Sequence, residues 1–308
     1  MPKISVIGAG NVGASLAQRL VEKDFADIVL LDIVEGLPQG KALDILESAP
    51  AVGFNANITG TNDYKDTAGS DVVVVTSGIG RKPGMSRDEL LDINVKIVSE
   101  VTRNIVKHSP DCVIVMVTNP VDTMTYLALK ISSFECSRVV GQSGMLDSAR
   151  FSSFIAAELK VPATEVKSFV MGEHGSHMVV IPRLATVKGK PITELLPGDV
   201  IERLVERTIN GGAEIVGLLK TGSAFYAPSA ATVRMVEAIM LDTREILPCA
   251  AYLQGEYGIE NIVIGVPVRL GRNGIEEIVE FKLTDAEKAI LEESAGAVRK
   301  LVSSIESE

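Results

Sequence analysis

The sequence predicts an α/β protein in which a doubly wound parallel sheet is followed by an α+β domain. Three observations predict this class. Short β-branched runs alternate with amphipathic helical stretches through the first half of the chain, and a glycine-rich turn joins the first run to the first helix. In the second half, strand signals followed by long helices replace this alternation.

The first half alternates between candidate strands and candidate helices. All strands but the first are near-continuous apolar runs, which is typical of strands that helices cover on both faces. The expected strands are Lys3–Gly8, Asp27–Ile33, Asp71–Thr76 and Cys112–Thr118. The expected helices are Val12–Lys23, Leu37–Ser48, Asp88–His108 and Val121–Ser132.

The pattern changes after about Val140. A hairpin with Gly255 and Gly258 in its turn region and a closing helix from Asp285 end the chain. Without a repeat or flexible linker, we expect two closely packed domains, residues 1–142 and 143–308. The expected elements before the closing helix are a helix at Leu146–Leu159, strands at Glu165–Met171 and Met178–Val187, helices at Val200–Leu219 and Ala230–Asp242, and the hairpin Glu245–Leu253 with Ile262–Leu270.

Composition narrows the class of protein. The chain has 308 residues and a formal net charge of −10, and without a Lys/Arg run it is not typical of a nucleic-acid binder. Cys112, Cys136 and Cys249 form no C-x-x-C pair, which disfavours a disulfide framework and fits a reducing cytosol. The N-terminus lacks a signal-peptide pattern, and no apolar run reaches the roughly 18 residues of a membrane span. We therefore expect a soluble, cytoplasmic protein with no nucleic-acid or membrane partner.

A glycine motif, Gly8-Ala9-Gly10-Asn11-Val12-Gly13, joins the first strand to the first helix. Gly8 permits a tight turn, Gly10 lets the backbone approach a pyrophosphate, and Gly13 lets helix and strand pack closely. The next strand ends in Asp32, about 20 residues on, where a carboxylate accepts hydrogen bonds from ribose hydroxyls and repels a 2′-phosphate. The motif predicts a Rossmann-type site for NAD rather than NADP. The alternative is a structural turn beside a solvated aspartate.

His174 is the candidate general base. It follows a short apolar strand, and flanking glycines keep the backbone slim near a ligand; a structural histidine is the alternative. His108 stands at a predicted helix end, where capping of the last carbonyls is its expected role. Asp147 and Arg150 share a helix face at i and i+3. Either they form only an ion pair, or Asp147 orients His174 while Arg150 clamps a substrate carboxylate.

Two arginines, Arg81 and Arg87, lie in a glycine- and proline-framed loop after the strand that ends at Thr76. Open α/β sheets bind ligands at this carboxyl edge, so the loop suits a lid that closes over an anion. The alternative is an ordinary basic surface loop. Asn119 ends another strand at the same edge and supplies an amide for a substrate oxygen.

In this order, the segments GAGNVG, RKPGMSRDEL, VTNPVD, LDSAR and MGEHG resemble the malate/lactate dehydrogenase family. The resemblance covers essentially the whole chain, and it is closest to bacterial and archaeal malate dehydrogenases that share the lactate dehydrogenase architecture. It implies an NAD-dependent enzyme acting on a small dicarboxylate, malate or oxaloacetate, as in the tricarboxylic acid cycle. The second domain is then the catalytic and substrate domain.

The resemblance also implies roles for matching residues and an assembly. His174 is the proton acceptor and Asp147 its partner; no metal ion is implied. We expect a symmetric homo-oligomer, a dimer or a tetramer, with the apolar stretch Ala213–Leu219 as an interface unless it packs in the core. The substrate-binding residues are Arg81, Arg87, Asn119 and Arg150. The NAD site consists of the glycine motif (Gly8, Ala9, Gly10, Asn11, Val12 and Gly13), Asp32, Asn94 and the backbone of Val117, Thr118 and Asn119.

Two alternative functions and one departure from the sequence pattern of the family remain to be considered. A lactate dehydrogenase is disfavoured because the resemblance places Arg81 over the distal group of the substrate, where lactate enzymes carry Gln. A buried arginine facing a methyl group would cost about 3–5 kcal/mol. A non-catalytic NAD-sensing module leaves His174 and its partners without a purpose. The departure is Ser176-His177, which replaces the Asp that many relatives carry two residues after the base and adds a second imidazole.

Overall fold

The computed structural model describes residues 1–80 and 87–306. The helices are α1 (Asn11–Val21), α2 (Leu37–Glu47), α3 (Ala49–Val52), α4 (Arg87–His108), α5 (Val121–Ser132), α6 (Gly144–Leu159), α7 (Gly198–Leu219), α8 (Tyr226–Met240) and α9 (Asp285–Glu306). The strands are β1 (Lys3–Ile7), β2 (Asp27–Leu31), β3 (Ile58–Thr61), β4 (Val72–Val75), β5 (Val113–Met116), β6 (Val139–Gly141), β7 (Val166–Lys167), β8 (Val170–Gly172), β9 (Met178–Val180), β10 (Thr186–Val187), β11 (Lys190–Pro191), β12 (Glu245–Gln254), β13 (Glu260–Gly271) and β14 (Gly274–Ile278).

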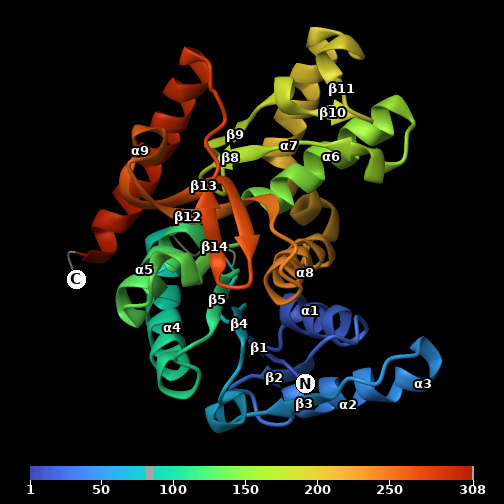
Figure 1. The fold of residues 1–308 in the computed structure, drawn as a ribbon, viewed down its shortest axis with the longest axis vertical. Helices are drawn as coiled ribbons and strands as arrows, with labels where there is room; N and C mark the ends of the chain where they lie inside the picture. The colour runs from blue at the N-terminus through green and yellow to red at the C-terminus, as the bar shows by residue number, and fades with distance from the viewer. Residues whose placement is uncertain (81–86, 307–308) are drawn as a thin grey trace.

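Parallel strands form the first part of the main sheet, in the order β3-β2-β1-β4-β5-β6 (Figure 1). Because β1 pairs with both β2 and β4, the winding direction reverses beside β1, as in doubly wound dinucleotide-binding domains. The carboxyl ends of β1, β2, β4 and β5 therefore meet at one edge. The expected Rossmann-type sheet is confirmed.

The four valines of β4 show why helices cover both faces of this sheet. Side chains alternate along a strand, so Val72 and Val74 pack into one hydrophobic cluster with Leu16 of α1. Val73 and Val75 pack into a second cluster with residues of α4 and α5. All four valines are fully buried. Because helices cover both faces of β4, every side chain of this strand is apolar.

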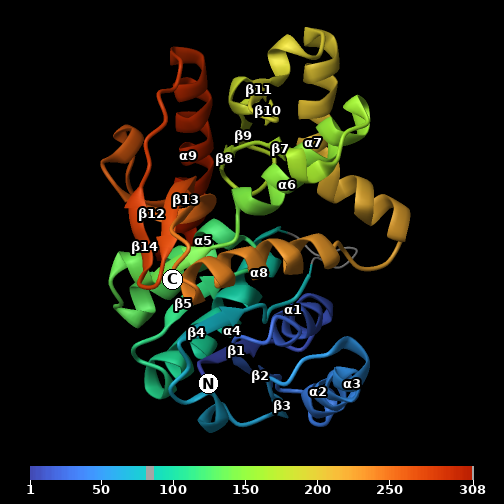
Figure 2. The same cartoon turned by 45° about the vertical axis from the view of Figure 1, so that its right-hand side comes forward.

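The sheet continues beyond β6 with antiparallel pairing. β12 pairs with β6 and with β13, and β13 pairs with β8, which pairs with β9. A single hydrophobic cluster extends from β1 to β13 and α9, and α8 of the second half packs against α1 of the first (Figure 2). The predicted division after residue 142 falls in the short link between β6 and α6. The α+β character of the second half is confirmed.

Several strands differ from the sequence expectation. β3 lies at the sheet edge with only two buried side chains, and β6 has three residues, so neither gives a strong sequence signal. The expected strand Met178–Val187 is two strands, β9 and β10, because a 3₁₀ turn at Pro182–Leu184 separates them. Proline cannot donate the next hydrogen bond of a strand ladder. Glu165–Met171 likewise contains two strands, β7 and β8.

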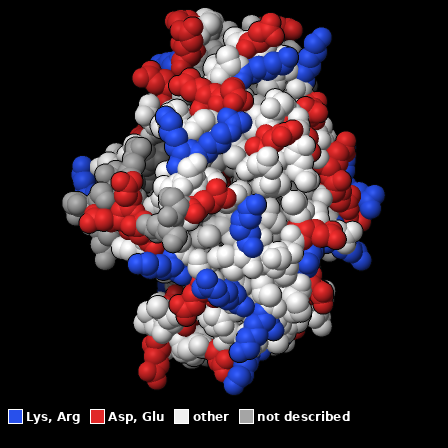
Figure 3. Space-filling view, turned by 90° about the vertical axis from the view of Figure 1, so that its left-hand side faces the viewer, with Lys and Arg blue, Asp and Glu red and all other residues white. Residues whose placement is uncertain are grey.

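The surface carries charges of both signs. Figure 3 shows acidic and basic side chains interspersed over the described residues of one face, rather than gathered in one basic band. Within residues 1–80 and 87–306, no helix has the length and apolar character needed to cross a membrane. The three cysteines are free thiols.

Candidate active site

The glycine motif forms the turn from β1 into α1, and the expected close packing is present. Gly8 has a φ of +105°, and a Cβ built on Gly13 would lie 1.8 Å from the carbonyl oxygen of Gly8. Any side chain there would push α1 away from β1. A Cβ on Gly10, by contrast, would meet no atom within 4 Å. Gly10 therefore borders open space at the N-terminus of α1, which leaves room for an anion.

Ala9 is held from two sides within this turn. Oδ2 of Asp32 accepts a hydrogen bond from the Ala9 N–H at 2.6 Å, and Nζ of Lys41 donates to the Ala9 carbonyl at 2.6 Å. Oδ1 of Asp32 accepts from the Val34 N–H at 3.0 Å. Each carboxylate oxygen keeps a lone pair for a ribose hydroxyl. Asp32 thus anchors the glycine turn and still presents acceptors beside it.

A cavity of about 310 Å³ opens beside this turn. Gly8, Gly10 and Asp32 belong to its polar wall, and Val34 and Ile97 belong to its apolar wall. Space for an anion, a carboxylate that can bind a ribose and an apolar slot for a nucleobase therefore follow one another along this cavity. The residues present fit the adenosine diphosphate half of a dinucleotide.

Asn94 joins the loops that follow β4 and β5. Its buried side chain accepts from the Ile79 N–H at 2.9 Å and donates to the Ile79 carbonyl at 3.2 Å and to the Asn119 carbonyl at 2.8 Å. Oγ1 of Thr118 donates to the Ser77 carbonyl at 2.7 Å. The residues expected near NAD, including Val117, thus lie at one sheet edge. Asn94 holds the two loops together, with its amide hydrogens engaged by the backbone.

His174, Asp147 and Arg150 form a buried cluster where the end of β8 meets α6. Nδ1 of His174 lies 2.7 Å from Oδ2 of Asp147, and Nη1 of Arg150 donates to Oδ1 of Asp147 at 3.0 Å. The exposed fraction of the Asp147 side chain is 1%, and that of each partner is 13%. The i, i+3 ion pair is therefore present, and the same carboxylate also holds the histidine.

This pairing gives the imidazole an orientation. With Asp147 ionised, Nδ1 carries the hydrogen and Nε2 is left to exchange a proton with a ligand. Burial by itself lowers the pKa of His174, and the charge of Arg150 lowers it further. The charge and hydrogen bond of Asp147, together with the charge of Asp122, outweigh these effects, so the net pKa of His174 is raised.

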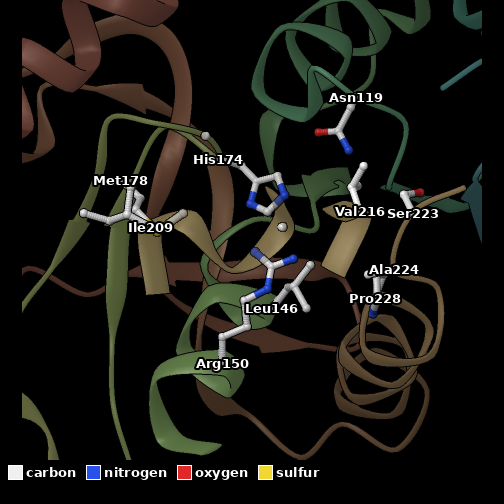
Figure 4. Close-up of a pocket in the computed structure, with 12 residues that line it drawn as sticks. Asn119, Leu146, Arg150, His174, Met178, Ile209, Val216, Ser223, Ala224 and Pro228 are labelled. Carbon is white, nitrogen blue, oxygen red and sulfur yellow. The ribbon is translucent and has the colours of Figure 1, made fainter. Parts of the chain in front are cut away.

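Figure 4 shows His174, Arg150 and Asn119 around a cavity of about 300 Å³. The guanidinium of Arg150 points toward the imidazole, and Asn119 enters from the loop after β5. Met178 and Pro228 contribute to the apolar part of the wall. The cavity thus offers a cation, a titratable imidazole and an amide. These groups suit the binding of a small carboxylate and proton transfer at a neighbouring oxygen.

The second imidazole, His177, is paired with Glu173. Its Nδ1 lies 2.8 Å from Oε2 of Glu173, which also accepts from the His177 N–H at 3.1 Å. The His177 side chain is 43% exposed, and His174 rather than His177 lines the cavity. At the Ser176-His177 departure, His177 therefore bonds to Glu173 within the loop that carries His174. Asp147 remains the partner of His174.

Two expected substrate-binding residues, Arg81 and Arg87, have no described side chain. Arg81 lies outside the described residues, and the side chain of Arg87, the first residue of α4, is not described either. Sequence reasoning missed Lys41 and Asp122, each a single charged residue whose contacts are distant in sequence. Across the described part of the chain, no three His, Cys, Asp or Glu side chains lie close enough to hold a metal ion.

Comparison with known proteins agrees with this geometry. Residues 2–141 match the family described as lactate/malate dehydrogenase, NAD binding domain, and residues 144–308 match its alpha/beta C-terminal domain. The chain is 58% identical over 305 residues to a malate dehydrogenase of Dehalococcoides mccartyi, covering 99% of both chains. It is 55% identical over 306 residues to a malate dehydrogenase of Methanosarcina barkeri, covering 99% of this chain and all of that protein.

A solved structure extends the likeness to three dimensions. The malate dehydrogenase of Salinibacter ruber superposes with a TM-score of 0.95 at 49% identity, covering 99% of this chain and 98% of that one. The resemblance expected from the motifs, the fold class and the NAD cofactor are confirmed. The chain belongs to the lactate/malate dehydrogenase family.

Proposed function

We propose that this protein is an NAD-dependent malate dehydrogenase that interconverts (S)-malate and oxaloacetate. One observation carries the proposal: the cavity where His174, Arg150 and Asn119 meet, at the same sheet edge as the glycine turn. Relatives named malate dehydrogenase, 55% and 58% identical over nearly the full length, support the choice of substrate.

The chain would hold NAD through its glycine turn and strand ends. The open space at Gly10 would take the pyrophosphate, Asp32 would bind the adenosine ribose, and the backbone of Val117–Asn119 would border the nicotinamide. When bound, NAD supplies the acceptor for the hydride of malate, or the hydride itself in the reverse direction. Asp32 would disfavour NADP because its charge would face the 2′-phosphate.

The chain's own residues bind the substrate and move a proton. Arg150 would bind the carboxylate beside the reacting carbon with the donors that Asp147 leaves free. Asn119 would orient the substrate oxygen. Neutral His174 would accept the hydroxyl proton of malate at Nε2, and Asp147 would stabilise the imidazolium that forms. In reverse, protonated His174 would return this proton to the carbonyl oxygen of oxaloacetate.

The lid residues would complete the site. Arg87 would help polarise the carbonyl, and Arg81 would bind the distal carboxylate that malate has and lactate lacks. Closing over the substrate would also exclude water. Pro228, from the small segment Ala227–Ser229 that fits malate enzymes, lines the cavity. A non-catalytic NAD-sensing module would leave the buried Asp147–His174 pair without a purpose.

We also propose a cytoplasmic homo-oligomer, a tetramer or a dimer, that works in the tricarboxylic acid cycle, with domains that divide after residue 142. Exposed apolar side chains near the end of α7 support an interface. Leu218 and Leu219 are 75% and 48% exposed, so these two residues do not pack in the core. Light scattering at micromolar concentration should show an oligomer, and a fully active monomer would contradict this.

A steady-state assay tests the proposed activity directly. Oxaloacetate and pyruvate are compared, each with NADH and with NADPH, by following absorbance of the reduced cofactor. We expect the highest kcat/KM for oxaloacetate with NADH. A preference for pyruvate would favour a lactate dehydrogenase, and NADH binding without turnover of any 2-oxo acid would favour the sensing module.

A further inference from the structure

A second buried carboxylate contacts the backbone of the candidate base. Asp122 lies in the first turn of α5, and its Oδ2 accepts a hydrogen bond from the His174 N–H at 2.8 Å. Its residue is 3% exposed, and its Oδ1 is buried without a hydrogen-bond partner in the described part of the chain. A buried carboxylate with one unpaired oxygen is costly unless a positive charge compensates it.

The other charges of this region are already paired. Asp147 is matched by the guanidinium of Arg150, and Glu173 has a hydrogen-bond partner in His177. The charged groups that face Asp122 are His174, Glu173 and Asp147. Of these three, only His174 can carry a positive charge. With Asp122 ionised, the group formed by Asp122, Asp147, Arg150 and His174 is therefore neutral when His174 is protonated and carries one uncompensated negative charge when His174 is neutral.

We propose that Asp122 is a positioning residue for the reaction, which fixes the backbone of His174 and serves as the counter-charge of its protonated imidazole. The inference rests on the proposed role of His174 as proton acceptor and donor. Asp147 and Asp122 would then have different roles. Asp147 sets the orientation of the ring and holds Arg150, whereas Asp122 compensates the positive charge that the ring gains when it is protonated.

Asp122 and His174 each shift the pKa of the other. Burial raises the pKa of Asp122 to about 7, although the hydrogen bond from the His174 N–H and the charge of His174 act in the opposite direction. The charge of Asp122 in turn raises the pKa of His174. Neutralising Asp122 should therefore let His174 lose its proton at a lower pH.

The test is Asp122→Asn, which removes the charge and keeps an oxygen that can accept the His174 N–H. The chain has three histidines, so in protein labelled with [¹³C]histidine the imidazole signals can be assigned with His108→Gln and His177→Gln. We expect the titration midpoint of His174 to fall by about 1 pH unit, with that of His108 unchanged. The pH midpoints of kcat/KM for oxaloacetate and for malate should fall by the same amount.

Further variants separate charge from structure. Thr123→Val is the matched control, because Thr123 is the next residue of α5, is fully buried and is uncharged; the His174 midpoint should stay at the wild-type value. Asp122→Ser repeats the neutralisation with a smaller side chain, should Asp122→Asn fail to fold. Asp122→Ala, which also loses the hydrogen bond, should show the same midpoint shift and a lower plateau of kcat.

An unchanged His174 midpoint in the folded neutral variant would overturn the proposal. The magnetic resonance titration needs neither substrate nor turnover. Its result therefore stands apart from the assay of malate dehydrogenase activity, and failure of one is distinguishable from failure of the other.

Discussion

Oδ2 of Asp147 lies 2.7 Å from Nδ1 of His174, so one carboxylate on α6 orients the candidate base that follows β8. Its other oxygen accepts from Arg150, which makes Asp147 the shared support of the base and of the carboxylate clamp. Because this support is 1% exposed, water cannot substitute for it. Changes at Asp147 should therefore affect chemistry more than cofactor binding.

Asp147→Asn should lower kcat with oxaloacetate and NADH by roughly 10²–10⁴-fold. The substitution keeps the size of the side chain but removes the charge that raises the pKa of His174. Its amide can also donate to Nδ1, which would leave the hydrogen on Nε2, the wrong nitrogen. Fluorescence titration should give a Kd for NADH close to that of the wild type. A kcat within twofold of the wild type would remove Asp147 from the mechanism.

Asp32→Ser should weaken NADH binding and admit NADPH, because no carboxylate then binds the ribose or repels the 2′-phosphate. The variant should also lose stability, since the N–H groups of Ala9 and Val34 lose a charged acceptor. We expect a loss of about 1–3 kcal/mol in the free energy of unfolding, measured with urea.

The exposed Asp44 of α2 provides the control for this prediction. Asp44→Ser removes the same charge from a residue that does not line the cavity beside Asp32 and should change neither the Kd for NADH nor the unfolding midpoint. If the wild-type enzyme used NADPH as well as it uses NADH, the ribose role of Asp32 would be wrong.

Asp122 should make the stability of the protein depend on pH. Its pKa is raised from 3.8 to about 7 in the folded state, so its contribution is fully present below pH 3.8 and is lost as the pH rises through 7. A difference of about 3 pKa units corresponds to roughly 4 kcal/mol at most. The free energy of unfolding of Asp122→Asn, relative to wild type, should therefore increase between pH 5 and pH 8. A pH-independent difference would show that Asp122 titrates normally.

The sequence predicted the parts of the site whose constraints are local. Gly8 and Gly13 were predictable because a tight turn and a close helix–strand contact require glycine within one short motif. Asp147 and Arg150 were predictable because residues three apart on a helix share a face. His174 was predictable because it stands beside glycines at the end of a short apolar strand.

The contacts that the sequence did not reveal join residues far apart in the chain. Lys41 binds the carbonyl of Ala9 across 32 residues, and Asp122 binds the N–H of His174 across 52 residues. A single lysine on a helix, or an aspartate in a first helical turn, has an ordinary local explanation. Only the fold shows that both act on the backbone of a functional loop.

The choice between malate and lactate depends on Arg81, whose role is a prediction from the sequence. Arg81→Gln should lower kcat/KM for oxaloacetate far more than for pyruvate, because only oxaloacetate has a distal carboxylate. Truncating one partner of a buried charge pair costs about 2–5 kcal/mol. At about 1.4 kcal/mol per tenfold, this is a loss of roughly 30- to 4,000-fold for oxaloacetate. Pyruvate should be unaffected or improve, since no arginine would then face its methyl group.

Arg150→Gln is the matched variant, because Arg150 lines the cavity beside His174 and would bind the carboxylate that both substrates share. Its loss should lower kcat/KM for oxaloacetate and pyruvate by similar factors. It also leaves Asp147 without its cation, which should raise the pKa of His174 further, since the charge of Arg150 lowers it. The contrast between the two variants separates recognition of the distal group from general anion binding. Equal losses for both substrates in Arg81→Gln would make Arg81 a nonspecific charge, and the preference for malate would then need another residue to explain it.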